Sequence, residues 1–401
     1  MVIIVGSGAG GGLLAMELAS ANIPVTLIEK GPFIETKDAF KYYDKSDEGV
    51  DLLKTTCIGG TTLVSTGNAV RSLEDDFKKL GIDLSNEFNE LEDDLNIHEL
   101  NDSHHGISSN IFIKSANKLN LNPCKMPKAI NEEKCIICGN CAFGCPVDAK
   151  WTSKDFVEIA EDNGAEILTN SEVIDLIIEN DQVKGVKILN NGKKEEIISD
   201  LVILSAGAIG SGIILQNAGI KAGEKLFFDS FVTVGGILKD VRLNKEIQMN
   251  GLVTGENFIL APHFSTIIYD ELKDKNIRSE DIFSIMVKIP DEPTGYIKNN
   301  KVFKNNSIKD GKYLAEGCAV AGFILKEAGV DPNTIKSTNI RGAHPGGTAA
   351  IGEVVDTNLQ TKINGLYVAD ASVLPKSPGK PPILTILALS KRLSNYIIAN
   401  Y

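Results

Sequence analysis

The chain has 401 residues, of which 43% are hydrophobic, and a formal net charge of -12 at pH 7. A chain of this length buries a large core and is expected to divide into about two domains. The acidic balance, without a cluster of Lys and Arg, argues against a nucleic-acid partner, because phosphate backbones are bound by clustered cations.

No segment is expected to cross a membrane or to direct export. The longest apolar stretch, 201–215, is shorter than the roughly 20 residues that a spanning helix needs, and it is interrupted by glycines. The first apolar run has no charged region ahead of it and breaks at Gly6, which is unlike a signal peptide. The seven cysteines are therefore expected to be reduced, metal-bound or buried rather than paired, and the protein to be cytoplasmic.

The first residues predict a dinucleotide site. Residues 2–12 read Val-Ile-Ile-Val-Gly-Ser-Gly-Ala-Gly-Gly-Gly, an apolar strand that leads directly into a G-x-G-x-x-G turn. In such a turn Gly6 permits the sharp bend, Gly8 lets the backbone approach a pyrophosphate, and Gly11 lets the next helix pack closely on its strand. The start of that helix then faces the phosphates.

A second strand supports the same interpretation. The helix is expected over about 12–20, and the next strand, 25–28, ends at Glu29. An acidic residue about 20 positions after the glycines is placed to accept hydrogen bonds from ribose hydroxyls. Strand, glycines, helix, strand and acid together predict an adenine dinucleotide.

The remaining pattern predicts a second, antiparallel sheet. Segments 164–198 have the turns and β-branched runs of a hairpin or meander, and the buried-strand pattern of 201–207 returns the chain to the parallel sheet. Short strands at 282–287, 295–297 and 301–303 suggest an antiparallel sheet, followed by one amphipathic helix over 310–328. We expect an α/β protein whose five segments are a first dinucleotide-binding part at 1–72, an acidic helical insert at 73–150, a second dinucleotide-binding part at 151–234, a substrate domain at 235–335, and a third dinucleotide-binding part at 336–401.

Several motifs along nearly the whole chain resemble the glucose-methanol-choline (GMC) oxidoreductases, which are FAD-dependent alcohol oxidases and dehydrogenases. The resemblance is carried by the N-terminal glycines with Glu29, Gly59-Gly60-Thr61-Thr62, residues 205–210, His344-Pro345-Gly346-Gly347-Thr348, and residues 365–372 leading into Thr385. It implies a discontinuous Rossmann-type FAD domain and a smaller substrate domain with an antiparallel sheet.

The resemblance also implies where FAD lies. Glu29 is expected at the adenosine ribose, Val173 beside the adenine, Gly60 and Thr61 along the flavin, and Asp370 near the ribityl chain and phosphates. The full set of expected FAD-binding residues is Gly6, Gly8, Gly11, Glu29, Gly59, Gly60, Thr61, Asn68, Val173, Ala206, Gly207, Asp370, Pro382 and Thr385.

His344 is the expected base. In the family a histidine in an H-P-x-G-T context lies beside the reactive flavin nitrogen, and imidazole is suited to take the hydroxyl proton while hydride goes to the flavin. Family members also place a His or Asn before Pro-x-x-Thr near the C-terminus, but this chain has Pro381 there, which offers no side-chain hydrogen bond. Lys380, Ser377 or His263 takes over that role, or the substrate is not a simple alcohol.

The run Cys135, Cys138, Cys141, Cys145, Pro146 has the C-x2-C-x2-C-x3-C-P spacing of bacterial-type ferredoxins and predicts metal binding. Three interpretations stay open. A [4Fe-4S] cluster would use all four thiolates, or a remote ligand from Cys57, Cys124 or Cys318. Structural zinc is less consistent, because zinc sites usually separate two cysteine pairs by a longer spacer. The third is a metal-free loop, since some long-chain alcohol oxidases and dehydrogenases of the family carry a similar segment followed by Lys and Ser, as Lys150 and Ser153 do here.

The expected reaction is hydride transfer from the CH-OH group of a small or lipid-like alcohol to FAD. Electrons then pass to an acceptor other than oxygen, through the cluster or to an acceptor protein. One alternative reverses the flow, with cluster electrons reducing FAD and FAD saturating a prenyl-like substrate. A second alternative is an electron-carrier flavoprotein without a substrate of its own.

Overall fold

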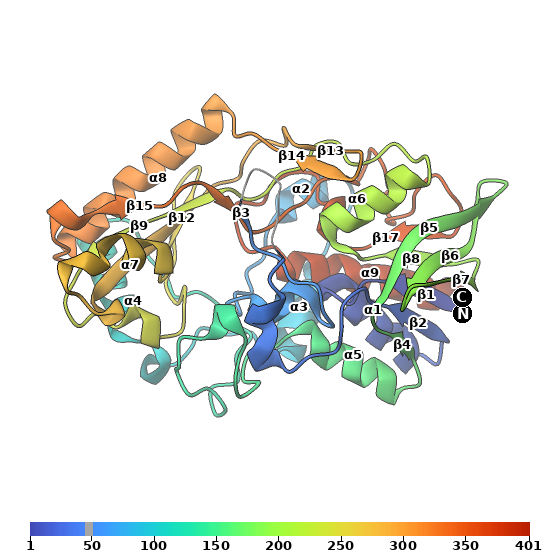
Figure 1. The fold of residues 1–401 in the computed structure, drawn as a ribbon, viewed down its shortest axis with the longest axis horizontal. Helices are drawn as coiled ribbons and strands as arrows, with labels where there is room; N and C mark the ends of the chain where they lie inside the picture. The colour runs from blue at the N-terminus through green and yellow to red at the C-terminus, as the bar shows by residue number, and fades with distance from the viewer. Residues whose placement is uncertain (45–50) are drawn as a thin grey trace.

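The structure is a computed structural model that describes residues 1–44 and 51–401. Figure 1 shows two sheets at opposite ends of the longest axis, with both termini at the end that carries the parallel sheet. The ammonium group of Met1 donates to the hydroxyl of Tyr401 over 2.7 Å, so the beginning of the first strand lies beside the end of the last helix.

The parallel sheet has the strand order β17-β8-β1-β2-β4, and every neighbouring pair is parallel. Its strands come from the beginning, the middle and the end of the chain: β1 (Val2–Val5), β2 (Val25–Ile28), β4 (Glu166–Leu168), β8 (Val202–Leu204) and β17 (Leu366–Val368). This arrangement confirms the expected Rossmann-type unit. Strands β1, β2, β8 and β17 are buried at every position, because a sheet with helices on both faces gives neither side of a strand to water.

Helix α1 (Ala9–Ser20) packs between α5 (Ser153–Asp162) and α9 (Ile383–Asn400). It begins three residues earlier than its apolar pattern predicts, with Gly8 as the N-cap and the amide of Gly12 bonded to the carbonyl of Gly8 over 2.9 Å. Gly10, Gly11 and Gly12 are therefore part of the helix, whereas Gly6 and Gly8 precede it.

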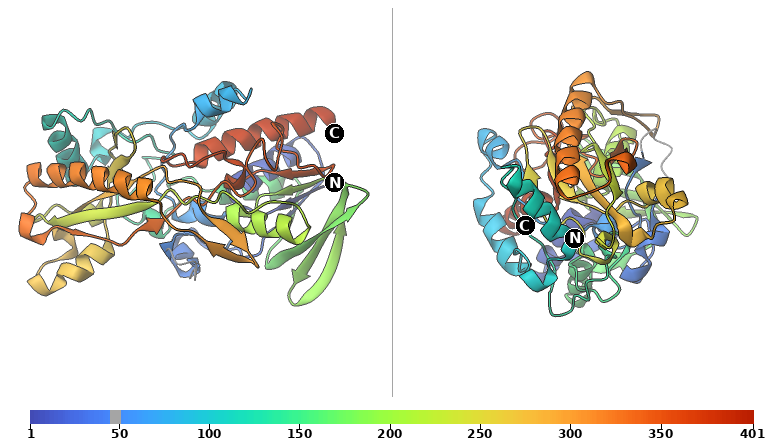
Figure 2. Two further views of the ribbon diagram at one scale, coloured as in Figure 1. Left: turned by 90° about the horizontal axis from the view of Figure 1, so that it is seen from above. Right: turned by 90° about the vertical axis from the view of Figure 1, so that its left-hand side faces the viewer.

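The predicted meander is a three-stranded antiparallel sheet of β5 (Ser171–Glu179), β6 (Gln182–Asn190) and β7 (Lys193–Ile198). Its first turn places Asn180 and Asp181 at φ values of 51° and 59°, which Asn and Asp tolerate better than other residues. Seen from above, this sheet projects from the body at the end that carries the termini (Figure 2).

The second large sheet has the order β10-β11-β12-β9-β16-β3, with β15 also paired to β9. Its strands are β3 (Asp51–Leu52), β9 (Phe231–Ile237), β10 (Val253–Thr254), β11 (Ile259–Pro262), β12 (Ile282–Lys288), β15 (Lys336–Ser337) and β16 (Arg341–Gly342). The central pairs β11/β12 and β12/β9 are antiparallel, as predicted, whereas the short pair β16/β3 is parallel.

Two strands predicted for that sheet lie elsewhere. The strands β13 (Tyr296–Lys298) and β14 (Lys301–Phe303) form a separate hairpin. Their inward residues Ile297 and Val302 join a small apolar cluster with Ile209 of α6 (Gly207–Asn217). Alternating sequence identifies such strands, but only the packing of their apolar faces decides which sheet they join.

Each large sheet has its own apolar core. The larger core surrounds the parallel sheet, and the second core lies between the antiparallel sheet and helices α4 (Ile107–Lys118) and α8 (Ile308–Glu327). Helix α8 covers the range predicted for it to within two residues. The other described helices are η1 (Thr36–Tyr42), η2 (Gly60–Val64), α2 (Glu74–Lys79), α3 (Ser85–Asp94), η3 (Asp102–His104), η4 (Cys141–Phe143), η5 (Leu243–Lys245), α7 (Thr266–Leu272), η6 (Lys273–Lys275), η7 (Ser279–Asp281), η8 (Pro332–Thr334) and η9 (Ala371–Val373).

Within the described ranges, no helix combines the length and apolar character needed to cross a bilayer.

Candidate active site

The glycines of the turn after β1 have different surroundings: two are tightly packed and one borders free space. A Cβ added to Gly6 would lie 2.3 Å from the carbonyl oxygen of Ser205, and one added to Gly11 would lie 1.9 Å from that of Gly6. At Gly8 the same added atom meets nothing within 4 Å. Gly6 and Gly11 therefore let the strand, turn and helix come together, and Gly8 leaves free space at the N-terminus of α1, where unpaired amides favour an anion.

The loop after β3 lies against this open space. A Cβ on Gly60 would be 3.4 Å from the Cα of Gly8, and Ser7 holds the loop by accepting a hydrogen bond from the amide of Gly59 over 3.0 Å. Thr61 is exposed and its hydroxyl accepts from the amide of Thr55. The two segments that were predicted to flank FAD at its phosphates and its flavin are thus neighbours in space.

Glu29 is buried at the end of β2. Its Oε2 accepts hydrogen bonds from the amide and hydroxyl of Ser7, and its Oε1 accepts from the amide of Gly31 over 2.8 Å. Burial raises the pKa of this carboxyl, and the hydrogen bonds from Ser7 and Gly31 oppose the rise. The carboxyl is held rigidly beside the glycine turn, which is the position expected for the ribose contact.

Two more residues expected to contact FAD, Asp370 and Gly207, lie near the start of α6. Asp370 is buried and accepts hydrogen bonds from the hydroxyl of Ser211 and the amide of Ser372. Gly207, at the start of α6, has nothing within 4 Å of an added Cβ, so backbone is open there as at Gly8. The residues present therefore fit an extended dinucleotide, with open backbone at two helix starts and two buried carboxylates.

The surroundings of five more predicted FAD residues are as follows. Val173 is buried on β5, Ala206 precedes α6, Pro382 is the N-cap of α9, and the Thr385 hydroxyl exchanges hydrogen bonds with Ser72. Asn68 is buried, and its Oδ1 accepts from the ammonium of Lys128 over 2.5 Å. Their contacts with FAD stay predictions.

His344 lies in a cluster of buried charged groups that the sequence did not predict. Its Nδ1 is 2.7 Å from Nζ of Lys288, the last residue of β12, and 2.9 Å from Oδ2 of Asp229. The His344 side chain is 23% exposed, whereas Lys288 and Asp229 are buried. Among the described residues nothing bonds Nε2 of the ring, so this nitrogen is available to a substrate.

Asp229 organises this cluster. Its Oδ1 accepts hydrogen bonds from the Ser377 hydroxyl and, over 3.0 Å, from the amide of Gly379. Its backbone has a φ of 50°, a left-handed conformation that is uncommon for a residue with a Cβ and often marks a functional site. The carboxylate is fixed in the one position from which it reaches Nδ1 of His344.

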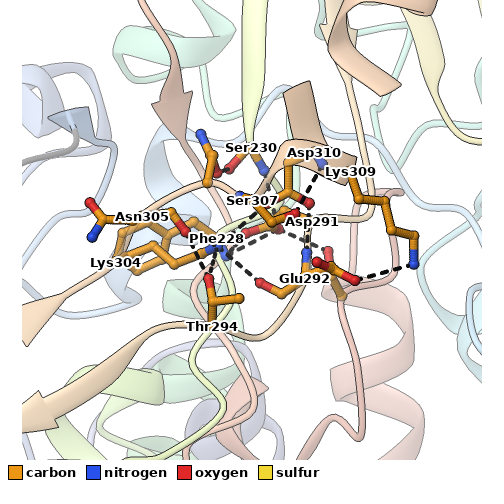
Figure 3. Close-up of polar contacts among 12 residues, drawn as sticks. Phe228, Ser230, Asp291, Glu292, Thr294, Lys304, Asn305, Ser307, Lys309 and Asp310 are labelled. Atoms are coloured by element: carbon orange, nitrogen blue, oxygen red, sulfur yellow. Dashed lines mark hydrogen bonds and ion pairs between the residues drawn. The ribbon is translucent and has the colours of Figure 1, made fainter. Parts of the chain in front are cut away.

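Behind Asp229 lies a second buried ion pair, shown in Figure 3. Asp291 accepts from the amides of Phe228 and Ser230, and lies 2.9 Å from Nζ of Lys304. The Ser377 hydroxyl is 3.2 Å from Asp291 and also bonds Asp229, so it joins the two carboxylates. The network therefore ties the site to the loop before α8.

Of the three groups proposed to replace the missing family residue, Ser377 contacts Asp229. His263 is half-buried, and its buried Nδ1 has no hydrogen-bond partner among the described residues. Burial, together with the nearby charges of Arg341 and Lys288, lowers the pKa of His263 to about 4. Lys380 is half-buried and forms no hydrogen bond or ion pair within the described part of the chain. Lys288, which the sequence analysis missed, is the lysine that contacts His344.

The four cysteines of the ferredoxin-like run line one small cavity, together with apolar side chains and Lys150. Cys141 and Cys145 are buried, Cys135 and Cys138 are half-buried, and none of the described cysteines forms a disulfide. Gly139 and Gly144, which lie between these cysteines, have φ values of 78° and 113°, in the left-handed region that favours glycine. In the described ranges, no group of three or more His, Cys, Asp or Glu residues is arranged to hold a single metal ion.

The sequence matches two family models, both described as GMC oxidoreductase. One covers residues 9–242 and the other covers residues 315–390. These spans include Gly11, Glu29, Asp229 and His344. The chain belongs to the GMC oxidoreductase family. It is therefore an FAD-dependent oxidoreductase, and the alternative of an electron carrier without a substrate is set aside.

Several known proteins are similar to this GMC oxidoreductase. An uncharacterized protein of Methanocaldococcus jannaschii is 35% identical over 98% of this chain and 99% of its own length. A long-chain-alcohol oxidase of Arabidopsis thaliana is 23% identical over 99% of this chain and 67% of its own. The crystal structure of pyridoxine 4-oxidase from Mesorbium loti matches 98% of both chains with a TM-score of 0.78 at 17% identity, which shows a common fold.

Two glycines in the N-terminal turn of this GMC oxidoreductase provide a matched test of the FAD site. In Gly10→Ala the new Cβ would lie 1.9 Å from the carbonyl oxygen of Ala369, so we expect a loss of stability of about 1–3 kcal/mol with or without FAD. In Gly8→Ala the Cβ meets no protein atom, so stability without FAD should be unchanged. FAD affinity should fall by about tenfold or more, about 1.4 kcal/mol, because the methyl group takes ligand space. Urea unfolding of the apoprotein and fluorescence titration with FAD measure the two effects, and unchanged affinity in Gly8→Ala would place the phosphates elsewhere.

Proposed function

We propose that this enzyme oxidises the CH-OH group of a small or lipid-like alcohol, with His344 as the base that takes the hydroxyl proton. The observation that carries the proposal is that the two ring nitrogens of His344 have different surroundings. Nδ1 is bound by buried groups, while Nε2 has no hydrogen-bond partner among the described residues and the side chain remains 23% exposed.

The carboxylate of Asp229 orients this base. When the ring proton is on Nδ1 it donates to Asp229 over 2.9 Å, and the lone pair of Nε2 then points away from the carboxylate. A substrate hydroxyl bonded to Nε2 can give up its proton as the C–H bond is broken. FAD, when bound, supplies the oxidant that accepts the hydride. Burial lowers the pKa of His344 to about 4, so the imidazole is uncharged at neutral pH.

Anaerobic mixing of the purified holoenzyme with a panel of alcohols tests the reaction. The panel contains 1-dodecanol and pyridoxine, because a long-chain-alcohol oxidase and pyridoxine 4-oxidase are among the similar proteins, together with ethanol and benzyl alcohol. Bleaching of the flavin absorbance by any of them supports the proposal. If no alcohol bleaches the flavin and a prenyl-like alkene reoxidises the dithionite-reduced enzyme, the reductase alternative replaces it.

We further propose that Cys135, Cys138, Cys141 and Cys145 hold a [4Fe-4S] cluster, which passes electrons from the flavin to an acceptor other than oxygen, such as an acceptor protein. A cluster is larger than a single ion, so its fit depends on four thiols around one cavity, as these are. The amide of Ala149 also donates to Sγ of Cys145 over 3.3 Å, a type of contact that tunes cluster potentials. A cytoplasmic location, where thiols stay reduced, is part of this proposal.

Two buried lysines beside the cavity support an anionic occupant. Lys128 and Lys150 are buried, burial lowers the pKa of Lys128 to about 7 and that of Lys150 to about 8, and the nearby Cys141 opposes both shifts when it is a thiolate. Buried cations need a compensating negative charge, which four thiolates around a cluster would supply. Lys150 also donates to the carbonyls of Thr62 and Leu63, so it links the cavity to the loop expected beside the flavin.

Iron and sulfide analysis of protein purified without oxygen tests the cluster. We expect about four irons and four sulfides per chain in the natural protein, and loss of most iron in Cys141→Ser. Cys124→Ser is the matched control, because Cys124 is exposed and outside the cavity, and it should keep its iron. Equal and negligible iron in all three proteins would leave the segment as a metal-free loop.

A further inference from the structure

We propose that Lys288 is the final acceptor of the hydroxyl proton, which reaches it through His344. This inference rests on the proposed alcohol oxidation and adds a residue to it. The two side chains are in direct contact, with Nζ 2.7 Å from Nδ1, and Nζ is 3.9 Å from Oδ2 of Asp229.

The geometry makes the charge of Lys288 decide the tautomer of His344. A protonated amine must donate to the lone pair of Nδ1, which leaves the single ring proton on Nε2. A neutral amine imposes no such donation, and Nδ1–H can then donate to Asp229 or to the amine. Only in this second arrangement does Nε2 have a lone pair for the substrate hydroxyl.

The proton transfers balance. The O–H bond of the alcohol breaks and its proton passes to Nε2, while the proton on Nδ1 passes to Nζ of Lys288. The electron pair of the C–H bond leaves as hydride to oxidised FAD, the acceptor that the family activity supplies. The ring ends neutral, with its proton on Nε2, and the new ammonium remains 3.9 Å from the carboxylate of Asp229.

The relative base strengths favour this direction. Burial lowers the pKa of Lys288 to about 8, and the carboxylates of Asp229 and Asp291 oppose that shift. Burial and the charge of Lys288 together lower the pKa of His344 to about 4, and Asp229 opposes the shift. The amine is thus the stronger base of the pair, so a proton delivered to the ring moves on to Nζ.

Two further charged groups face this cluster from the neighbouring strands. His263 follows β11, and the charge of Lys288 acts on it. Arg341 begins β16 and acts on His263 in the same direction. His263 is neutral near pH 8, because its pKa is lowered to about 4, so it adds no charge that competes with Lys288, whose own pKa is lowered to about 8. Since neutral Lys288 is the accepting form, alcohol oxidation should become faster as the pH rises through that value.

Nitrogen-15 NMR of histidine-labelled holoenzyme tests the proposal without a substrate. The signals of His344, assigned by their loss in H344Q, should show a tautomer change with a midpoint near pH 8, from Nε2–H at lower pH to Nδ1–H at higher pH. A merely structural lysine would not produce this transition. Absence of any change in the His344 signals between about pH 6 and 10 in the natural protein would overturn the proposal.

Two variants separate charge from packing. Lys288→Met should abolish the transition near pH 8 and raise the pKa of His344, because the neighbouring cation is gone. Lys288→Arg keeps a permanent charge and should hold the ring as Nε2–H throughout the range. Persistence of the transition in either variant would assign it to another group and contradict the proposal. These spectra do not depend on the alcohol panel, so failure of the proton relay and failure of alcohol oxidation are distinguishable.

Discussion

Replacing His344 by Gln is expected to slow anaerobic reduction of the flavin by about 100- to 10,000-fold, the usual contribution of a positioned general base. The amide cannot accept a proton at neutral pH, although it can still hydrogen bond to Asp229. The measurement is stopped-flow absorbance of the flavin with the alcohol that bleaches the natural enzyme fastest.

The control for this prediction is His98→Gln. His98 is bonded to Glu132 and to the carbonyl of Asn96, outside the His344 cluster, so its rate should match that of the natural enzyme. FAD content should be unchanged in both variants. A rate for His344→Gln within a few-fold of the control would show that another group removes the proton, and the mechanism would have to be rebuilt without this imidazole.

The largest expected effect on stability is at Lys304. Its ammonium lies 2.9 Å from Asp291 and 4.0 Å from Asp310, and all three side chains are buried (Figure 3). In Lys304→Met both carboxylates lose their buried cation, which costs about 3–5 kcal/mol when one partner of such a pair is removed. The measurement is the shift of the urea unfolding midpoint of the holoenzyme.

Lys309→Met is the matched control, and it is drawn in the same figure. Lys309 pairs with Glu292 over 3.3 Å, but both side chains are substantially exposed, and such pairs contribute about 1 kcal/mol or less. The two substitutions remove the same group from positions five residues apart in sequence. Equal, small shifts of the midpoint in both variants would contradict the view that the buried network supports the site.

The dinucleotide unit could be predicted from sequence because its signals are local. The turn between β1 and α1 depends on glycines within a few residues of one another, and Glu29 follows at a fixed distance along the next strand. Backbone sterics and strand periodicity determine such a unit wherever it occurs. The same reasoning identified the meander of β5–β7 and the helix α8.

Other assignments needed contacts that no local pattern contains. The strands β13 and β14 were recognised but assigned to the wrong sheet, since their apolar faces pack near α6. Helix α4 was predicted as part of an acidic insert, yet its apolar side packs in the core of the antiparallel sheet. Partner choice depends on the shapes of surfaces that are far apart in sequence.

The candidate site shows the same division. His344 stood out through its neighbours in the chain, and the cysteine run through its spacing. Lys288 did carry a signal, because it is a lysine at the end of the mostly apolar run of β12. The strand pattern alone, however, does not show which residue such a lysine contacts. Lys380, adjacent to the altered motif in sequence, was chosen instead and does not contact His344 among its described interactions.

The sequence by itself determined the glycine turn after β1, the family and the choice of His344 as the proposed base, because these depend on short-range geometry and on motifs of fixed spacing. Only the tertiary structure decided which charged groups surround that base. Asp229, Lys288 and His344 are separated by more than 50 residues, and they meet because antiparallel pairing sets β9 beside β12 and places the loop after β16 against Phe228. Burial then makes their charges depend on one another, and burial is a property of the folded molecule rather than of any segment.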